Sequence, residues 1–146
     1  MASCVSYNDQ FVWMANRRFD AMIEFLLTVA TESAGTSEER AMVEKLREAS
    51  RAFFPGYDLH LEREFPTVEE RKFWARCFYN LARAIFLRKV GNQETDFWQS
   101  SAIADAYVIA RFLTQAVREV EQSWYPATDD ALRSEEFYGK LSNIRV

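Results

Sequence analysis

The feature that most constrains the fold is residues 67–90, a long segment that carries both a start and a stop signal for one helix. Pro66 precedes Thr67, and Glu70 follows three residues after Thr67, which is the pattern of a capping box at a helix N-terminus. Gly91 then supplies the residue type that commonly ends a helix in a left-handed conformation. The segment therefore predicts a single long helix.

The rest of the chain also favours helices. Four Gly and three Pro in 146 residues leave little material for the turns of a many-stranded fold. Apolar residues at helical spacing predict three more main helices and a short one near the C-terminus. Their expected ranges are from Asn8 or Asp9 to about 33, from 37 to the Pro55-Gly56 stop, from about 94 to 124, and about 129–138. We expect one all-α domain over 1–146, an up-down bundle of four main helices with a short fifth C-terminal helix, and flexible ends at 1–8 and 139–146.

Two places do not fit this pattern cleanly. Residues 57–65 alternate apolar and polar side chains as a strand does, but one isolated strand would have no partner. We therefore expect an ordered loop or a short helix there. Trp13 and Phe25 fall outside the apolar stripe of the first helix, and we expect them to form a second packing surface. That stripe consists of Phe11, Val12, Phe19, Met22, Ile23, Leu26 and Ala30.

The helix at 67–90 mixes cations and aromatic rings on the side opposite its core stripe, which contains Trp74, Cys77, Phe78, Leu81 and Ile85. Residues 67–91 hold six basic and two acidic side chains, in a chain with a net charge of −4. One interpretation is that the rings pack on another helix while the cations extend past them. The other is a partner-binding face of aromatic anchors and arginines, residue types enriched at interface hot spots. The residues concerned are Lys72, Arg76, Tyr79, Arg83 and Phe86.

The sequence carries no pattern for a metal, a cofactor or a catalytic site. His60 is the one histidine and has Tyr57 three residues before it, which excludes the Glu-x-x-His pattern of di-iron bundles. One histidine and two distant cysteines, Cys4 and Cys77, do not make a zinc site. Cys77 lies on the predicted core face of its helix, which disfavours it as a nucleophile paired with His60. We therefore predict a non-enzymatic protein without metal or cofactor.

Charge and hydropathy limit the partners and the compartment. A pI of about 5.1 makes nucleic acid an unlikely general partner, because a phosphate backbone selects for positive surface. The first ten residues lack a basic region followed by an apolar run, and the longest apolar runs are too short to span a bilayer. These features predict a cytoplasmic protein that is not embedded in a membrane.

We therefore expect a helical interaction protein that binds and occludes or adapts another protein, as immunity proteins, inhibitors and adaptors do. Its partner would be a toxin or an effector, and Lys72, Arg76, Tyr79, Arg83 and Phe86 would form the binding face. Two alternatives remain open. The same face would instead join two copies in a homodimer, or Arg76, Arg83 and Tyr79 would bind a small anionic ligand in a pocket of the bundle.

Overall fold

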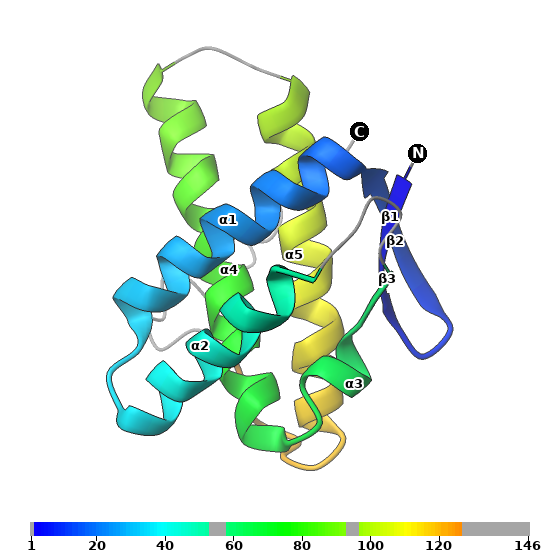
Figure 1. The fold of residues 1–146 in the computed structure, drawn as a ribbon, viewed down its shortest axis with the longest axis vertical. Helices are drawn as coiled ribbons and strands as arrows, with labels where there is room; N and C mark the ends of the chain where they lie inside the picture. Colours follow the sequence, from blue (N-terminus) through cyan, green and yellow to red (C-terminus); the bar gives the residue numbers. More distant parts are fainter. Residues whose placement is uncertain (1, 53–57, 93–96, 127–146) are drawn as a thin grey trace.

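The chain folds as helices with a small sheet at one side (Figure 1). A computed structural model describes residues 2–52, 58–92 and 97–126, and for 86–92 and 97–101 it describes the backbone alone. In Figure 1, α4 and α5 stand side by side and α1 crosses in front of them. The described elements are β1 (Ala2–Tyr7), β2 (Gln10–Ala15), α1 (Asn16–Ser33), α2 (Ser37–Ser50), β3 (Asp58–His60), α3 (Leu61–Glu64), α4 (Val68–Asn92) and α5 (Phe97–Arg118).

The first two strands form an antiparallel hairpin with a two-residue turn. Tyr7 lies opposite Gln10 at the closed end, and Asn8 and Asp9 connect them. Asn8 has a φ of 52°, and asparagine is one of the few residues other than glycine that adopts this left-handed conformation readily. A polar pair of this kind between two strands is a typical hairpin turn.

The third strand lies on the other side of β1, so the strand order is β2-β1-β3. β3 runs parallel to β1, with Leu59 opposite Val5. One face of the sheet packs on the helices, because its side chains are buried in the same hydrophobic core as theirs; this face holds Val5, Tyr7, Val12, Met14 and Leu59. Within the described residues, β2 pairs with β1 only, which leaves the second edge of β2 without a neighbouring strand.

The sheet shows that the prediction of an all-α, up-down four-helix bundle is wrong. Most of the described residues are helical, but the described part of the chain also holds a three-stranded mixed sheet. The helix expected from Asn8 or Asp9 begins only at Asn16, and residues 10–15 form β2. The expected flexible leader contains β1. A strand is stabilised by residues distant in sequence, so a pattern read within one segment did not reveal it.

The alternating stretch at 57–65 also contains a strand that depends on residues distant in sequence. We rejected a strand there for want of a partner, yet β1 supplies that partner and Asp58–His60 forms β3. The expectation of a short helix is confirmed immediately afterwards, where Leu61–Glu64 forms α3.

Two helix starts predicted from capping residues, near residues 37 and 67, are confirmed, whereas the start predicted at Asn8 or Asp9 is wrong. The Glu70 N–H donates to the Thr67 hydroxyl at 3.1 Å, and that hydroxyl donates to Glu70 Oε1 at 3.0 Å. α2 begins at Ser37 as expected, and its cap is Thr36, whose hydroxyl accepts from the Glu39 N–H at 3.1 Å. Each bond satisfies a backbone donor that the first helical turn leaves free.

The predicted core stripes of the first and last main helices are largely confirmed. In α1 the buried residues are Phe19, Met22, Ile23, Leu26 and Ala30. For the helix expected from about 94 to 124, the sequence predicts an apolar stripe of Trp98, Ala102, Ala106, Ile109, Leu113, Val117, Val120 and Trp124. In α5 the members of this stripe from Ala102 to Val117 are buried. The stripe does not continue to Val120, which is 69% exposed beyond the end of α5. The predicted helix at 129–138 and the flexible end at 139–146 lie outside the described residues.

Helix α4 is the central helix and is buried around most of its circumference. It packs on both α1 and α5, and the small residues Ala106 and Ala110 of α5 are fully buried. Both sides of α4 are therefore covered, and for Tyr79 this agrees with the interpretation that its ring packs on another helix. The buried residues of its middle part are Phe73, Trp74, Ala75, Cys77, Phe78, Tyr79, Leu81 and Ala82.

Candidate functional site

The predicted partner-binding face of α4 is not one continuous outward surface. The Tyr79 side chain is 1% exposed and belongs to the hydrophobic core, not to the solvent side. Arg83 is half-buried, and the side chain of Phe86 lies outside the described part of the structure. The structure thus places one of the two predicted aromatic anchors inside the molecule.

Two cations of this face are paired within the chain. Lys72 Nζ contacts the carboxylates of Glu69 and Glu121, and Arg76 Nη2 lies 3.3 Å from Glu39 Oε2. The hydrogen bond that Lys72 donates to the Glu121 carboxylate is the main cause that raises the pKa of Lys72 above its usual value. These internal ion pairs compete with any acidic partner for the same side chains, so the role of this face in binding stays a prediction.

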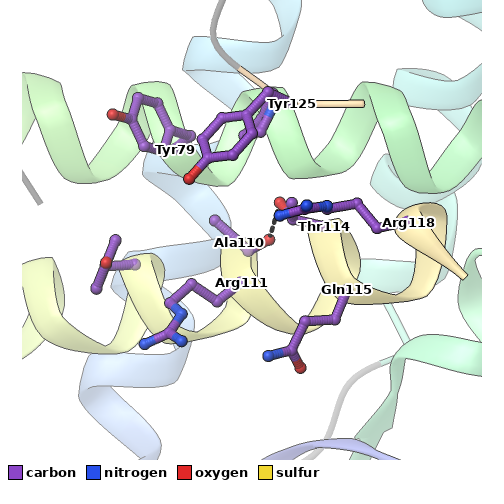
Figure 2. A pocket seen from close by; sticks show the side chains of 9 residues that line it. Tyr79, Ala110, Arg111, Thr114, Gln115, Arg118 and Tyr125 are labelled. Carbon is purple, nitrogen blue, oxygen red and sulfur yellow. Dashed lines mark hydrogen bonds between the residues drawn. The ribbon is translucent and has the colours of Figure 1, made fainter. Parts of the chain in front are cut away.

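A cavity of about 330 Å³ lies where Tyr79 meets α5 (Figure 2). Tyr79 reaches toward it from α4, while α5 contributes two arginines and the polar side chains between them. Among its described lining residues none is acidic. The lining consists of Tyr79, Tyr107, Ala110, Arg111, Thr114, Gln115, Arg118, Tyr125 and Pro126.

The two arginines of this cavity are held by tyrosine rings. The Arg111 guanidinium carbon lies 5.9 Å from the centre of the Tyr107 ring, and that of Arg118 lies 5.8 Å from the centre of the Tyr125 ring. Arg118 Nε also donates to the Gln122 carbonyl at 2.9 Å. Such contacts restrict the guanidinium groups and leave their remaining N–H groups free to donate.

The most exposed aromatic pair of the described residues lies on β2. Phe11 is 57% exposed and Trp13 is 61% exposed, and their rings stack with centroids 6.5 Å apart. They alternate with buried Val12 and Met14, as expected when one face of a strand is in water. The expected second packing surface at Trp13 is therefore not present. The period-two alternation after the Asn8-Asp9 turn is the signal that sequence reasoning missed.

A serine, a histidine and a glutamate meet beside this pair but do not form a catalytic triad. Ser6 Oγ lies 3.0 Å from His60 Nδ1, and Glu62 Oε1 lies 3.9 Å from the same nitrogen. In a triad the nucleophile and the carboxylate contact opposite ring nitrogens, so that the histidine can pass a proton. Here both approach one nitrogen, and the geometry describes a bridging structural contact.

The two thiols are buried and unreactive. Burial raises the pKa of the Cys77 thiol to about 12, and burial together with the nearby Asp58 carboxylate raises that of Cys4. The thiolate is the nucleophilic form, so neither cysteine is activated.

No protein-family model, no curated protein and no solved structure matches this chain. Among the described residues no group of three metal-ligating side chains comes together. Within the same residues no helix combines the length and the apolar character needed to cross a bilayer.

Proposed function

We propose that this chain is a non-enzymatic interaction protein that binds an extended, apolar segment of another protein along the free edge of β2. The observation that carries the proposal is the stacked, exposed pair Phe11 and Trp13. Large aromatic side chains dominate binding energy at interfaces, and contiguous exposed apolar patches mark interaction sites.

The backbone of β2 supports this mode of binding. In a hairpin closed by a two-residue turn, the closing pair is hydrogen-bonded and the pattern then alternates along the strands. Gln10 belongs to the closing pair, so Phe11 and Trp13 lie in the non-hydrogen-bonded pairs of the ladder. Their N–H and C=O groups therefore point away from β1. Arg18 Nη2 approaches the Trp13 carbonyl at 3.5 Å, which fits that orientation. A carbonyl has two acceptor sites, so this long contact leaves it able to accept from an added strand.

The edge also lacks the usual protection against pairing. Edge strands are commonly blocked by lysine, proline or inward-pointing charges. The six residues of β2, QFVWMA, contain neither a charged residue nor a proline. An uncharged edge accepts an uncharged partner strand without leaving a charge unpaired. The partner chemistry we infer is a segment with alternating apolar side chains that pack on the two rings.

From the sequence we keep the proposal that binding occludes or adapts the partner, which would be a toxin or an effector, in the manner of immunity proteins, inhibitors and adaptors. We also keep the cytoplasm as the proposed compartment. Both cysteines are free thiols, as is usual in a reducing environment.

The test is selection of a random peptide library displayed on phage against the purified chain. We expect enrichment of peptides with alternating apolar residues. Phe11→Ser with Trp13→Ser should weaken their binding by more than about 2 kcal/mol, or roughly thirtyfold. Val120→Ser is the matched control, because it removes an equally exposed apolar side chain elsewhere. Circular dichroism verifies that each variant is folded.

Three results would overturn the proposal. The first is a library that yields no enriched peptide. The second is a set of peptides whose affinity is unchanged by the double substitution. The third is a dimer in sedimentation experiments that dissociates in the double variant, because the edge would then belong to a second copy of the chain.

A further inference from the structure

We infer that the cavity between α4 and α5 is a binding site for a small aromatic anion, whose charged group pairs with Arg111 and Arg118 and whose planar ring lies against the tyrosines. This site is separate from the β2 edge, and either proposal can fail without the other. Its volume of about 330 Å³ falls at the lower end of the range of small-molecule sites.

The charge of the cavity points to an anion. No carboxylate of the described residues pairs with Arg111 or Arg118, whereas Arg18 and Arg76 each pair with one. Two guanidinium groups thus face one cavity without a counter-charge from its described lining, in a chain whose net charge is −4. Guanidinium groups bind carboxylate and phosphate oxygens through paired N–H donors.

The arrangement along α5 favours a ligand larger than a simple ion. Arg111 and Arg118 are seven residues apart, which places them on one side of the helix about two turns, or roughly 10 Å, from each other. Thr114 and Gln115 lie between them. The Thr114 hydroxyl already donates to the Ala110 carbonyl at 2.7 Å, so toward a ligand it serves as an acceptor.

The tyrosines supply the surface for a planar body. Tyr79 and Tyr107 are buried, and with Tyr125 they contribute three rings to the lining. Rings pack favourably on one another in offset or edge-to-face arrangements. A ligand that joins a flat ring to a carboxylate or a phosphate matches both the arginines and the tyrosines of the lining. Titration with benzoate and with phenyl phosphate distinguishes a carboxylate from a phosphate as the preferred anionic group.

The probes are phenyl phosphate, benzoate and inorganic phosphate, each titrated into the full chain by isothermal titration calorimetry. We expect saturable binding of phenyl phosphate or benzoate, and binding of inorganic phosphate at least about tenfold weaker, because it lacks the ring. Arg111→Gln and Arg118→Gln should each weaken binding of the aromatic anion at least about tenfold. Arg40→Gln, which removes one exposed positive charge away from the cavity, should leave the affinity unchanged.

Two outcomes would overturn the inference. One is no saturable binding of either aromatic anion at millimolar concentration. Another is an equal loss of affinity in Arg40→Gln, because binding would then follow overall charge. If Arg118→Gln does not fold, the exposed Arg111 still provides the test, with the thermal midpoint as the check on folding.

Discussion

Two regions of the molecule place aromatic rings beside arginines, and they differ in what is left for a partner. On α4, Tyr79 is buried, and Arg76 is paired with Glu39. On β2, Phe11 and Trp13 are stacked and more than half exposed. The comparison teaches that a helical wheel identifies a face but not whether another element covers it. Available surface is decided by tertiary neighbours, and here α5 covers α4 while no described strand pairs with the outer edge of β2.

The largest expected difference between these regions is in stability. Tyr79→Ala should lower the free energy of unfolding by about 3–5 kcal/mol, because it removes a buried ring and leaves a cavity. Trp13→Ala should lower it by less than about 1 kcal/mol, because most of that side chain already contacts water. Urea unfolding followed by far-ultraviolet circular dichroism measures both. Similar losses in the two variants would show that the rings are equally part of the core.

The second prediction uses Cys77 as a reporter of burial on α4. Its pKa is about 12 in the folded chain against 9.0 for the exposed thiol. Above pH 9 the unfolded chain loses this proton while the folded chain keeps it, so the free energy of unfolding falls as pH rises toward 12. Between pH 8 and pH 10 the loss should be about 1.4 kcal/mol.

Cys77→Ala is the control for this measurement, because the variant lacks the titrating thiol, so the loss should appear as the difference between the natural chain and the variant. Other groups that titrate in this range contribute equally to both chains. An unchanged pH dependence in Cys77→Ala would mean that the thiol is accessible and that α4 is less covered than described.

The smallest expected effect is the coupling energy of the ion pair between Arg76, on the predicted face of α4, and Glu39. A double-mutant cycle of Arg76→Gln and Glu39→Gln should give a coupling energy of about 0.2–1 kcal/mol, the range of partly exposed pairs. The cycle is needed because Glu39 also accepts from the Gly35 N–H. A coupling energy of zero would show that Arg76 is free, and it would return the α4 face to consideration as a docking surface.

The sequence predicted what is encoded locally. The capping residues Thr67 and Glu70 located the start of α4, and the stripes of α1 and α5 identified their buried faces. It did not predict the sheet, because β2 and β3 each depend on β1, and β1 showed no helical pattern to attract attention. The alternation in QFVWMA was present, but its apolar residues were assigned to the stripe of a helix that begins seven or eight residues later than expected.

The candidate sites were predictable to different degrees. Tyr79 was singled out, and the structure places it at a cavity whose arginines are Arg111 and Arg118 instead of Arg76 and Arg83. Those two lie on α5, where the sequence predicted no site residue. Convergence of side chains from α4 and α5 depends on how the helices pack, and no spacing within either segment encodes it.

Amide hydrogen exchange along β2 tests the central claim most directly. In the isolated chain, the amides of Phe11 and Trp13 should exchange rapidly with solvent, while those of Val12 and Met14 are protected by β1. A bound peptide from the library should then protect Phe11 and Trp13 and leave other surface amides unchanged. Binding without new protection at these two amides would contradict the account, because the peptide would not be pairing with the edge of the sheet.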